Sequence, residues 1–225
     1  MRYVHALNVD NWPAVRSPGT GRALRMVTSA DPGLAAPAFP VEVAVQRICG
    51  RHRNLARVFA AQQGHAEAIA AGACPPDFPL MAAILRYIGL HLLGNHHRVE
   101  ESCLLAAMRE RGASGQLVDA TLGAHNQSAR KFAALQSAFG AWRQQPDLRN
   151  PPFLELAADY RECELGHIAF EEDVLLPCAV ETLPASDWVA IAKAFRNEDD
   201  PLFGSSPDPQ LIPLQHVLGA GTMTH

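Results

Sequence analysis

Four histidines lie in the middle of apolar rows that repeat at spacings of three and four residues: His52, His96, His125 and His167. A histidine in such a row is expected to be buried. One buried imidazole is ordinary, because a neighbouring carbonyl group can satisfy it. Four of them are better explained by a bound metal, since neutral imidazole is a good ligand for iron, zinc or copper.

Two of these histidines are followed, four residues later, by a glutamate. Glu100 follows His96, and Glu171 follows His167. Residues at i and i+4 project from one face of a helix, so each imidazole and its carboxylate can bind the same metal cluster. Carboxylates can also bridge two metal ions and offset their charge. The expected metal ligands are therefore the four histidines together with Glu100 and Glu171.

A second register on the same segment competes with His96 and Glu100. His97 and Glu101 also differ by four residues, and their row is partly apolar. The row of His96 is longer and more regular, so we prefer it. His97 stays open as an extra ligand or as a neighbour of the site. The more ordinary interpretation is a half-exposed histidine paired with Glu101.

Other polar residues near these rows have more ordinary interpretations. Glu172 is a minor alternative to Glu171, and Tyr160 is expected to pack in the core with a tethered hydroxyl, less readily to contact the metals. His91 is five residues before His96, so it is expected to point elsewhere. Three cysteines near the site are expected to act as small buried hydrophobes: Cys49, Cys103 and Cys163. Surface positions are expected for His5, His65, His216 and His225.

The first two histidines lie on two expected helices. The first helix begins at Val41 and is stopped by Pro75 and Pro76, with Gly64 and Gly72 weakening it. Its inner face is expected to carry Val45, Ile48, His52, Leu55 and Phe59. The second helix begins after Asp77, a good N-cap residue, and ends near Gly112. Its inner face is expected to carry Leu85, Ile88, Leu92, His96, Val99 and Cys103.

Two further helices are expected to carry the other two histidines. The third follows Ser114 and is closed by Pro146. Its inner face is expected to carry Val118, Leu122, His125, Ala129 and Phe132. The fourth begins with Asn150 as N-cap and Pro151 at the first helical position. Its inner face is expected to carry Leu156, Tyr160, Cys163, His167, Phe170 and Val174, and its end is bracketed by Pro177 and Pro184.

The pattern predicts an all-α protein whose core is an up-down-up-down four-helix bundle. Residues 1–40 are expected to form an irregular N-terminal arm, and residues 41–204 the bundle with a short fifth helix from Ser186 to about Asn197. Residues 205–225 carry three prolines and are expected to form an irregular tail. Neither arm is expected to supply a metal ligand.

The composition limits the classes of function. Apolar residues make up 48% of the chain, and the few aromatics and many alanines favour packed helices. A net charge of −4 without a basic cluster argues against nucleic-acid binding. No apolar run is long enough for a membrane span, and the beginning lacks a signal-peptide pattern. Five scattered cysteines do not indicate a disulfide framework, so the expected compartment is the cytoplasm.

At these residues the chain resembles the hemerythrin-like family, also called the HHE cation-binding domain. The resemblance covers roughly residues 41–204. Its matching segments are RHRNL, GNHHRVEESCLL, GAHNQ and GHIAFEEDVLLP, and LPASDWVAIAKAFRNEDDPLFG resembles a C-terminal extension of bacterial members. The resemblance implies a four-helix bundle around a non-haem centre of two iron ions, with a bridging oxo or hydroxo group and two bridging carboxylates.

The resemblance also implies a range of functions. Classical oxygen carriers of the family have five histidines, two of them four residues apart on the third helix, where this chain has Ala129 after His125. It is closer to members with four histidines and two glutamates, which are linked to iron repair and nitric oxide stress. The expected function is to bind, sense or reduce oxygen, nitric oxide or peroxide. The alternatives are an iron donor or store, with a protein partner for iron or electron transfer, and a metal-free helical interaction module.

Overall fold

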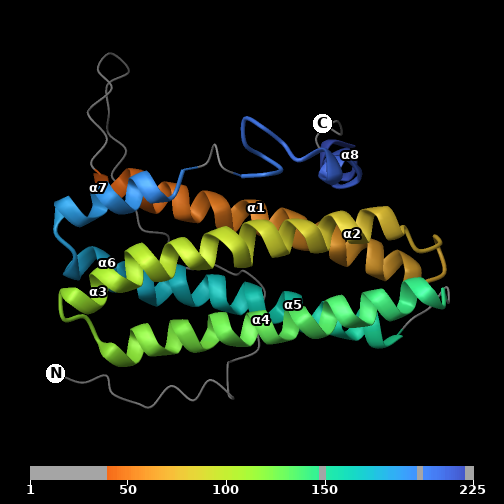
Figure 1. Cartoon of the computed structure of the whole chain (residues 1–225), viewed down its shortest axis with the longest axis horizontal. Coiled ribbons are helices and arrows are strands. Elements are labelled where there is room, and N and C mark those ends of the chain that lie inside the picture. Colours follow the sequence, from red (N-terminus) through yellow and green to blue (C-terminus); the bar gives the residue numbers. More distant parts are fainter. Residues whose placement is uncertain (1–39, 147–150, 197–199, 221–225) are drawn as a thin grey trace.

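Helices make up all of the regular secondary structure in the residues that the computed structural model describes, which are 40–146, 151–196 and 200–220. Figure 1 shows long helical segments lying side by side along the longest axis of the molecule. The predicted all-α class is thus confirmed for these residues. The first two segments are α1 (Pro40–Ala70) and a continuous run of α2 (Phe78–Tyr87), η2 (Ile88–His97), η3 (Glu100–Leu105) and α3 (Ala106–Glu110).

The later segments complete the body of the protein. They are α4 (Gly115–Gln144), then α5 (Pro151–Phe170), which continues into η4 (Glu171–Leu175) and α6 (Leu176–Thr182). The short α7 (Ala185–Ala194) lies against α1, as Figure 1 shows. This is the predicted fifth helix, although it begins one residue earlier and its expected end at Asn197 lies outside the described residues. No helix in the described ranges is long and apolar enough to cross a membrane.

The helix ends follow the local signals only in part. Asp77 caps α2 as predicted, because its side chain accepts a hydrogen bond from the Leu80 backbone N–H at 2.9 Å. Ser114 stands at the N-cap position of α4, but its side chain makes no capping hydrogen bond. Gly64 does not weaken α1 visibly, and the chain turns at Gly72 instead. Gly72 and Gly112 adopt positive φ angles of 71° and 76°, which glycine tolerates just beyond a helix end.

Three π-helical stretches occur at the level of the predicted ligands. They are η2, which contains His96 and His97, η3, which begins at Glu100, and η4, which begins at Glu171. A π-turn closes its hydrogen bond one residue later than an α-turn, so it shifts the residues that follow around the helix axis. Adjacent residues such as His96 and His97 can therefore both be buried, which a regular 3.6-residue period does not predict.

Two apolar clusters lie on either side of the level that holds the histidines. One packs the far end of α1 with α2, α4 and α5 and includes Leu55, Phe59, Tyr87, Trp142 and Phe153. The other packs the beginning of α1 with η3, α6 and α7 and includes Ile48, Leu104, Val118, Trp188 and Phe195. Burial of each large apolar side chain contributes roughly 1.5–3 kcal/mol to folding. These two clusters pack the helices together on both sides of the polar layer that contains the histidines.

The expectation of an irregular tail over residues 205–225 is wrong for residues 209–220. These residues form η6 (Pro209–Leu211) and α8 (Ile212–Ala220), which pack on α1 and α2. Leu211 and Leu214 are completely buried in the first apolar cluster. The prolines were misleading because Pro209 and Pro213 fall in the first turns of these elements, where proline does not break a helix. Residues 1–39 of the expected N-terminal arm (residues 1–40) lie outside the described residues, as does Asn150, and Pro40 begins α1.

The docked tail gives a direct test of this packing. We expect Leu214→Ala to lower the free energy of unfolding by about 2–4 kcal/mol, because it leaves a cavity in the core. The control is Val217→Ala on the same helix, whose side chain is 42% exposed; its effect should stay within about 0.5 kcal/mol. Urea unfolding followed by circular dichroism measures both, and equal losses would mean that α8 is not held by Leu214.

Candidate metal centre

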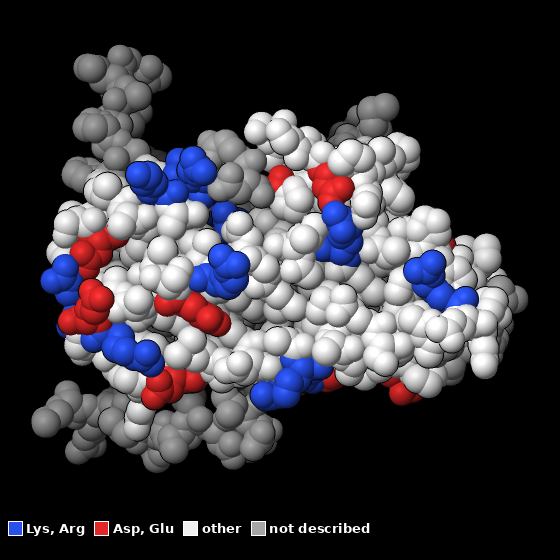
Figure 2. Space-filling view, in the orientation of Figure 1, with Lys and Arg blue, Asp and Glu red and all other residues white. Residues whose placement is uncertain are grey.

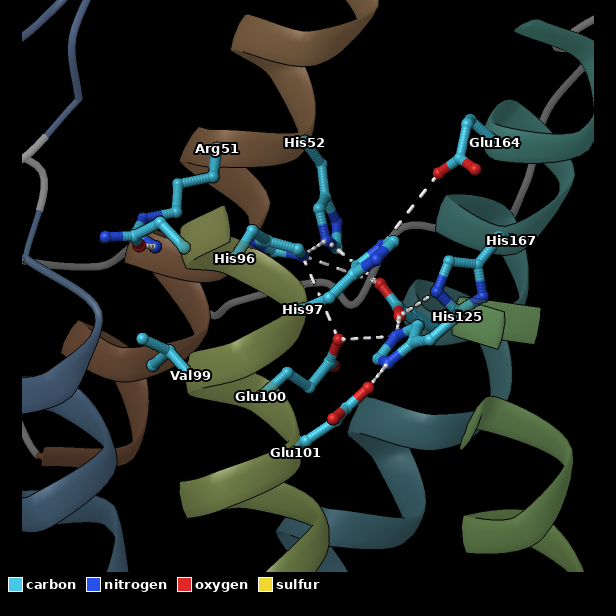
Figure 3. Close-up of polar contacts among 12 residues, drawn as sticks. Arg51, His52, His96, His97, Val99, Glu100, Glu101, His125, Glu164 and His167 are labelled. Carbon is cyan, nitrogen blue, oxygen red and sulfur yellow. Dashed lines mark hydrogen bonds and ion pairs between the residues drawn. The ribbon is translucent and has the colours of Figure 1, made fainter. Parts of the chain in front are cut away.

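All six residues predicted as metal ligands converge on one buried layer. His52 lies on α1, His96 on η2, Glu100 on η3, His125 on α4, His167 on α5 and Glu171 on η4. None is more than 4% exposed. Figure 3 shows His52, His96, His125 and His167 pointing toward one another from separate helices, with Glu100 beside them. The structure therefore brings these six residues together in one layer of the core; that they bind metal stays a prediction.

One group of potential ligand atoms forms around His52 and His96. The Nε2 atom of His52 lies 3.1 Å from Glu171 Oε2 and 3.2 Å from His96 Nε2. His96 Nε2 lies 3.9 Å from Glu100 Oε2 and 4.0 Å from Glu171 Oε2. Potential ligand atoms of His52, His96 and Glu171 all lie within 4.8 Å of one another, close enough to hold one metal ion.

A second group forms around His125 and His167 on the other side of the same carboxylates. His167 Nε2 lies 2.7 Å from Glu171 Oε1. His125 Nε2 lies 3.4 Å from Glu100 Oε2 and 3.6 Å from Glu171 Oε1. Glu171 thus contacts imidazoles of both groups through its two oxygens, and Glu100 contacts His96 and His125. This is the arrangement in which two carboxylates can bridge two metal ions.

His97 is a fifth buried imidazole in this layer. It is 4% exposed, and its ring stacks on that of His125 with the centroids 3.9 Å apart and the planes at 11°. Its ligand nitrogen groups with those of His125 and His167 within 4.8 Å. The interpretation of a half-exposed histidine paired with Glu101 is wrong, because Glu101 contacts His125 and η2 turns His97 inward.

The prediction that Ala129 follows His125 on the inner face of the third helix is wrong. Ala129 is exposed, and the buried neighbour is Ser128, one position earlier. The Ser128 hydroxyl lies 3.3 Å from the Tyr160 hydroxyl, which is itself completely buried. A substituent at Ala129 would therefore point to solvent. The absence of a histidine at that position carries no information about ligands at the centre.

Glu164 is a buried carboxyl group that the sequence reasoning missed. It is completely buried, and its Oε2 atom lies 3.9 Å from His97 Nε2 (Figure 3). Burial raises its pKa. Glu164 comes three residues before His167 and four after Tyr160, so the inner face of α5 runs through Tyr160, Glu164, His167 and Glu171. That spacing was the sequence signal for a buried Glu164. The predicted inner row instead ran through Cys163 and Phe170 to Val174, which is exposed.

Two half-exposed glutamates orient two of the imidazoles from outside. The Nδ1 atom of His52 lies 2.9 Å from Glu172, and the Nδ1 atom of His125 lies 2.8 Å from Glu101. A hydrogen bond from Nδ1–H to a carboxylate leaves Nε2 free to act as a ligand toward the centre. Glu172 thus lies outside Glu171 and does not take its place.

The ionisation of the layer is set by a balance between burial and mutual attraction. Burial alone would raise the pKa of Glu171, but the imidazoles of His167, His125 and His52 hold that pKa well below its usual range. Burial, together with the Glu171 charge, raises the pKa of Glu100 to about 7. Burial would lower the pKa of His52 and His125, yet their contacts with glutamates raise these values to about 9 and about 10.

The remaining predicted neighbours lie beside the centre. His91 is completely buried, and its Nε2 atom lies 3.4 Å from Asp200 Oδ2, away from the two glutamates. Cys49, Cys103 and Cys163 are partly buried free thiols. Burial raises the pKa of the Cys49 and Cys163 thiols to about 11, which does not favour reactive thiolates.

One comparison with known proteins gave a match. The family described as Hemerythrin HHE cation binding domain matches residues 43–179, which is more than half of the chain. The matched range holds all five central histidines together with Glu100 and Glu171. The comparison with curated proteins and the comparison with solved structures each gave no significant match.

The positions of the adjacent glutamates on η4 predict unequal effects on metal retention. We expect Glu171→Gln to abolish tight retention, because Glu171 contacts imidazoles of both groups. Glu172→Gln should weaken affinity by about 10–100-fold, the usual effect of losing a partner that orients a ligand. Metal content after desalting against a chelator measures both variants. A stronger loss in Glu172→Gln would show that the outer carboxylate, and not the inner one, is the ligand.

Proposed function

The chain belongs to the hemerythrin HHE cation-binding domain family, and from that premise we propose that it holds a non-haem centre of two iron ions and binds, senses or reduces a small molecule such as oxygen, nitric oxide or peroxide. The observation that carries the proposal is the meeting of five buried imidazoles around two buried carboxylates. The grouping of their ligand atoms supports two adjacent metal positions.

The buried polar atoms of the layer fit a metal centre. Nε2 of His125 and of His167, and both carboxylate oxygens of Glu100 and Glu171, are buried without a hydrogen bond of good geometry. Each buried polar atom left in this way costs roughly 1–3 kcal/mol. Metal coordination would satisfy these atoms together, whereas a plain helical interaction module gives no reason to bury them. Mixed nitrogen and oxygen donors suit iron better than a purely soft or purely hard cation.

The two groups suggest how the ligands would be shared. His52 and His96 would hold one iron, and His125 and His167 would hold the other, with His97 as the fifth imidazole. Glu100 and Glu171 would bind both ions. When bound, two irons supply a Lewis-acidic and redox-active pair. The protein itself contributes Glu101 and Glu172, which fix the tautomers of His125 and His52. It also contributes the two apolar clusters, which keep water away from the layer.

The family arrangement that best fits the helices is the up-down-up-down four-helix bundle. It is supported by the four long segments in Figure 1 and by packing of α4 on α5 and of α1 on α5. In such a bundle each helix carries its ligands inward at the same level. Complete burial of the ligands also favours retention of iron over ready transfer to a partner, which is the alternative function of an iron donor or store.

Iron content is the primary test of the proposal. Protein produced with ample iron should contain about two irons per chain, because two groups of ligands share two bridging carboxylates. Metal analysis by plasma emission, together with the visible absorption of the oxidised protein, measures this. Replacing His216, which is exposed and distant in sequence from the centre, by Ala should change neither result. One zinc per chain without iron would overturn the proposal.

The coordination count predicts a position for an external ligand. Two six-coordinate metals need about twelve donor positions. Five imidazoles, two bridging carboxylates and a bridging oxygen would fill about eleven of them, so one should remain open. Azide added to the oxidised protein should therefore bind and change its visible absorption.

The same azide titration tests whether His97 is a metal ligand. If His97 is a ligand, His97→Ala should bind an additional azide, or bind azide more tightly, because a second position opens. His216→Ala again serves as the control for loss of an imidazole. An unchanged azide titration in His97→Ala would exclude His97 from the coordination sphere, and failure of the native protein to bind azide would contradict small-ligand binding.

A further inference from the structure

A second set of metal-binding side chains lies on the outer side of His52. Cys49 precedes His52 by one turn of α1, and Glu172 follows Glu171 at the start of η4. Potential ligand atoms of Cys49, His52 and Glu172 lie within 4.8 Å of one another. The central ligands are almost completely buried, but the Glu172 side chain is 40% exposed and Cys49 is only partly buried. This outer set therefore reaches the surface, where a metal ion can arrive.

The imidazole of His52 separates the outer set from the centre. Its Nδ1 atom lies 2.9 Å from Glu172 on the outer side, and its Nε2 atom lies 3.1 Å from Glu171 on the inner side. Figure 3 shows His52 projecting from α1 into the central cluster. The same ring thus presents one nitrogen to each set of ligands. An ion bound at the outer set would therefore be separated from the centre only by this imidazole ring.

We propose that Cys49, His52 and Glu172 form an outer site that captures a divalent transition metal, such as ferrous iron, before it enters the buried centre. The inference rests on the proposed function for its destination, but the outer site is defined by its own residues. Thiolate, imidazole and carboxylate together suit borderline divalent ions such as Fe²⁺, Co²⁺ and Zn²⁺. The Cys49 thiol loses its proton to solvent when the metal binds, and no electron is transferred.

The two sites exclude each other because a neutral imidazole has only one free lone pair. Before the centre is filled, the Nε2 side of the ring faces Glu171 Oε2 at 3.1 Å and keeps its proton, and the arriving ion displaces the Nδ1 proton to solvent and binds Nδ1. After the ion has moved inward, Nε2 binds metal and Nδ1–H donates to Glu172. The proton that leaves Nε2 is matched by the proton that Nδ1 gains. The outer site is therefore present while the protein takes up metal and is lost when the centre is complete.

Cobalt(II) is a suitable probe, because thiolate coordination gives an intense near-ultraviolet charge-transfer absorption that oxygen and nitrogen ligands lack. In the Glu171→Gln protein the centre lacks its shared carboxylate, so cobalt should stay at the outer site. We expect a stable thiolate–cobalt absorption in Glu171→Gln that disappears in the Glu171→Gln/Cys49→Ser double variant. The matched control is Glu171→Gln/Cys163→Ser, since Cys163 is also a partly buried thiol near the centre; it should keep the absorption.

Uptake kinetics in the otherwise native protein supply a second, independent readout. Cys49→Ser should slow ferrous iron uptake several-fold without changing the final iron content, whereas Cys163→Ser should not slow it. Circular dichroism checks that each variant is folded. Absence of the thiolate absorption in Glu171→Gln, or an unchanged uptake rate in Cys49→Ser, would overturn the outer site. A lasting thiolate–cobalt absorption in the native protein, together with no iron at its centre, would support the outer site and contradict the proposed di-iron function, so the two failures are distinguishable.

Discussion

Glu171 is an ionised carboxylate that no solvent reaches, and the arrangement of the protein depends on compensating its charge. An isolated buried carboxylate would be protonated, because desolvation penalises its charged form. Here His52, His125 and His167, from three different helices, contact its two oxygens at 2.7–3.6 Å. These contacts fix how close the helices come and at which level they meet. A shift of one helix along its axis would remove one of these three contacts.

The same constraint explains the local departures from regular helix. An α-helix buries one stripe of residues, but the polar layer needs His96, His97 and Glu100 from one segment at nearly one level. The π-helical stretches η2 and η3 widen the helix there, and η4 does so at Glu171. The C-terminal residues close the outer flank of the layer. The ring of Phe195 packs edge-on against His96 with the centroids 5.7 Å apart, and Cζ of Arg51 lies 5.2 Å from the centroid of the Phe195 ring.

The sequence predicted the buried face of a helix best where that helix keeps the regular 3.6-residue period. His52 and His125 lie on regular α-helices, where apolar rows of period 3.6 find the buried face, and the i,i+4 glutamates marked the other two helices. His97 was judged half-exposed because the same period was applied across η2, which nothing in the local sequence marks as a π-helix. Glu164 was missed because α5 also carries the charged residues Glu155, Asp159, Arg161 and Glu162, and acidic side chains on such a helix are usually exposed. The docking of α8 depends on contacts with α1 and α2, which are distant in sequence, so its prolines suggested an irregular tail.

The raised pKa values of His52 and His125 have a consequence for the charge balance of the core. With pKa values of about 9 and about 10, both imidazoles carry an extra proton at neutral pH until a metal replaces it. In the proposed di-iron centre, metal uptake would therefore be an exchange of cations, in which these imidazoles release protons as the metal binds. Glu171 would then keep positive charge nearby with or without metal. Acid would oppose metal loading, and alkali up to these pKa values would promote it. The iron content of the proposed centre would thus depend on the proton activity around it.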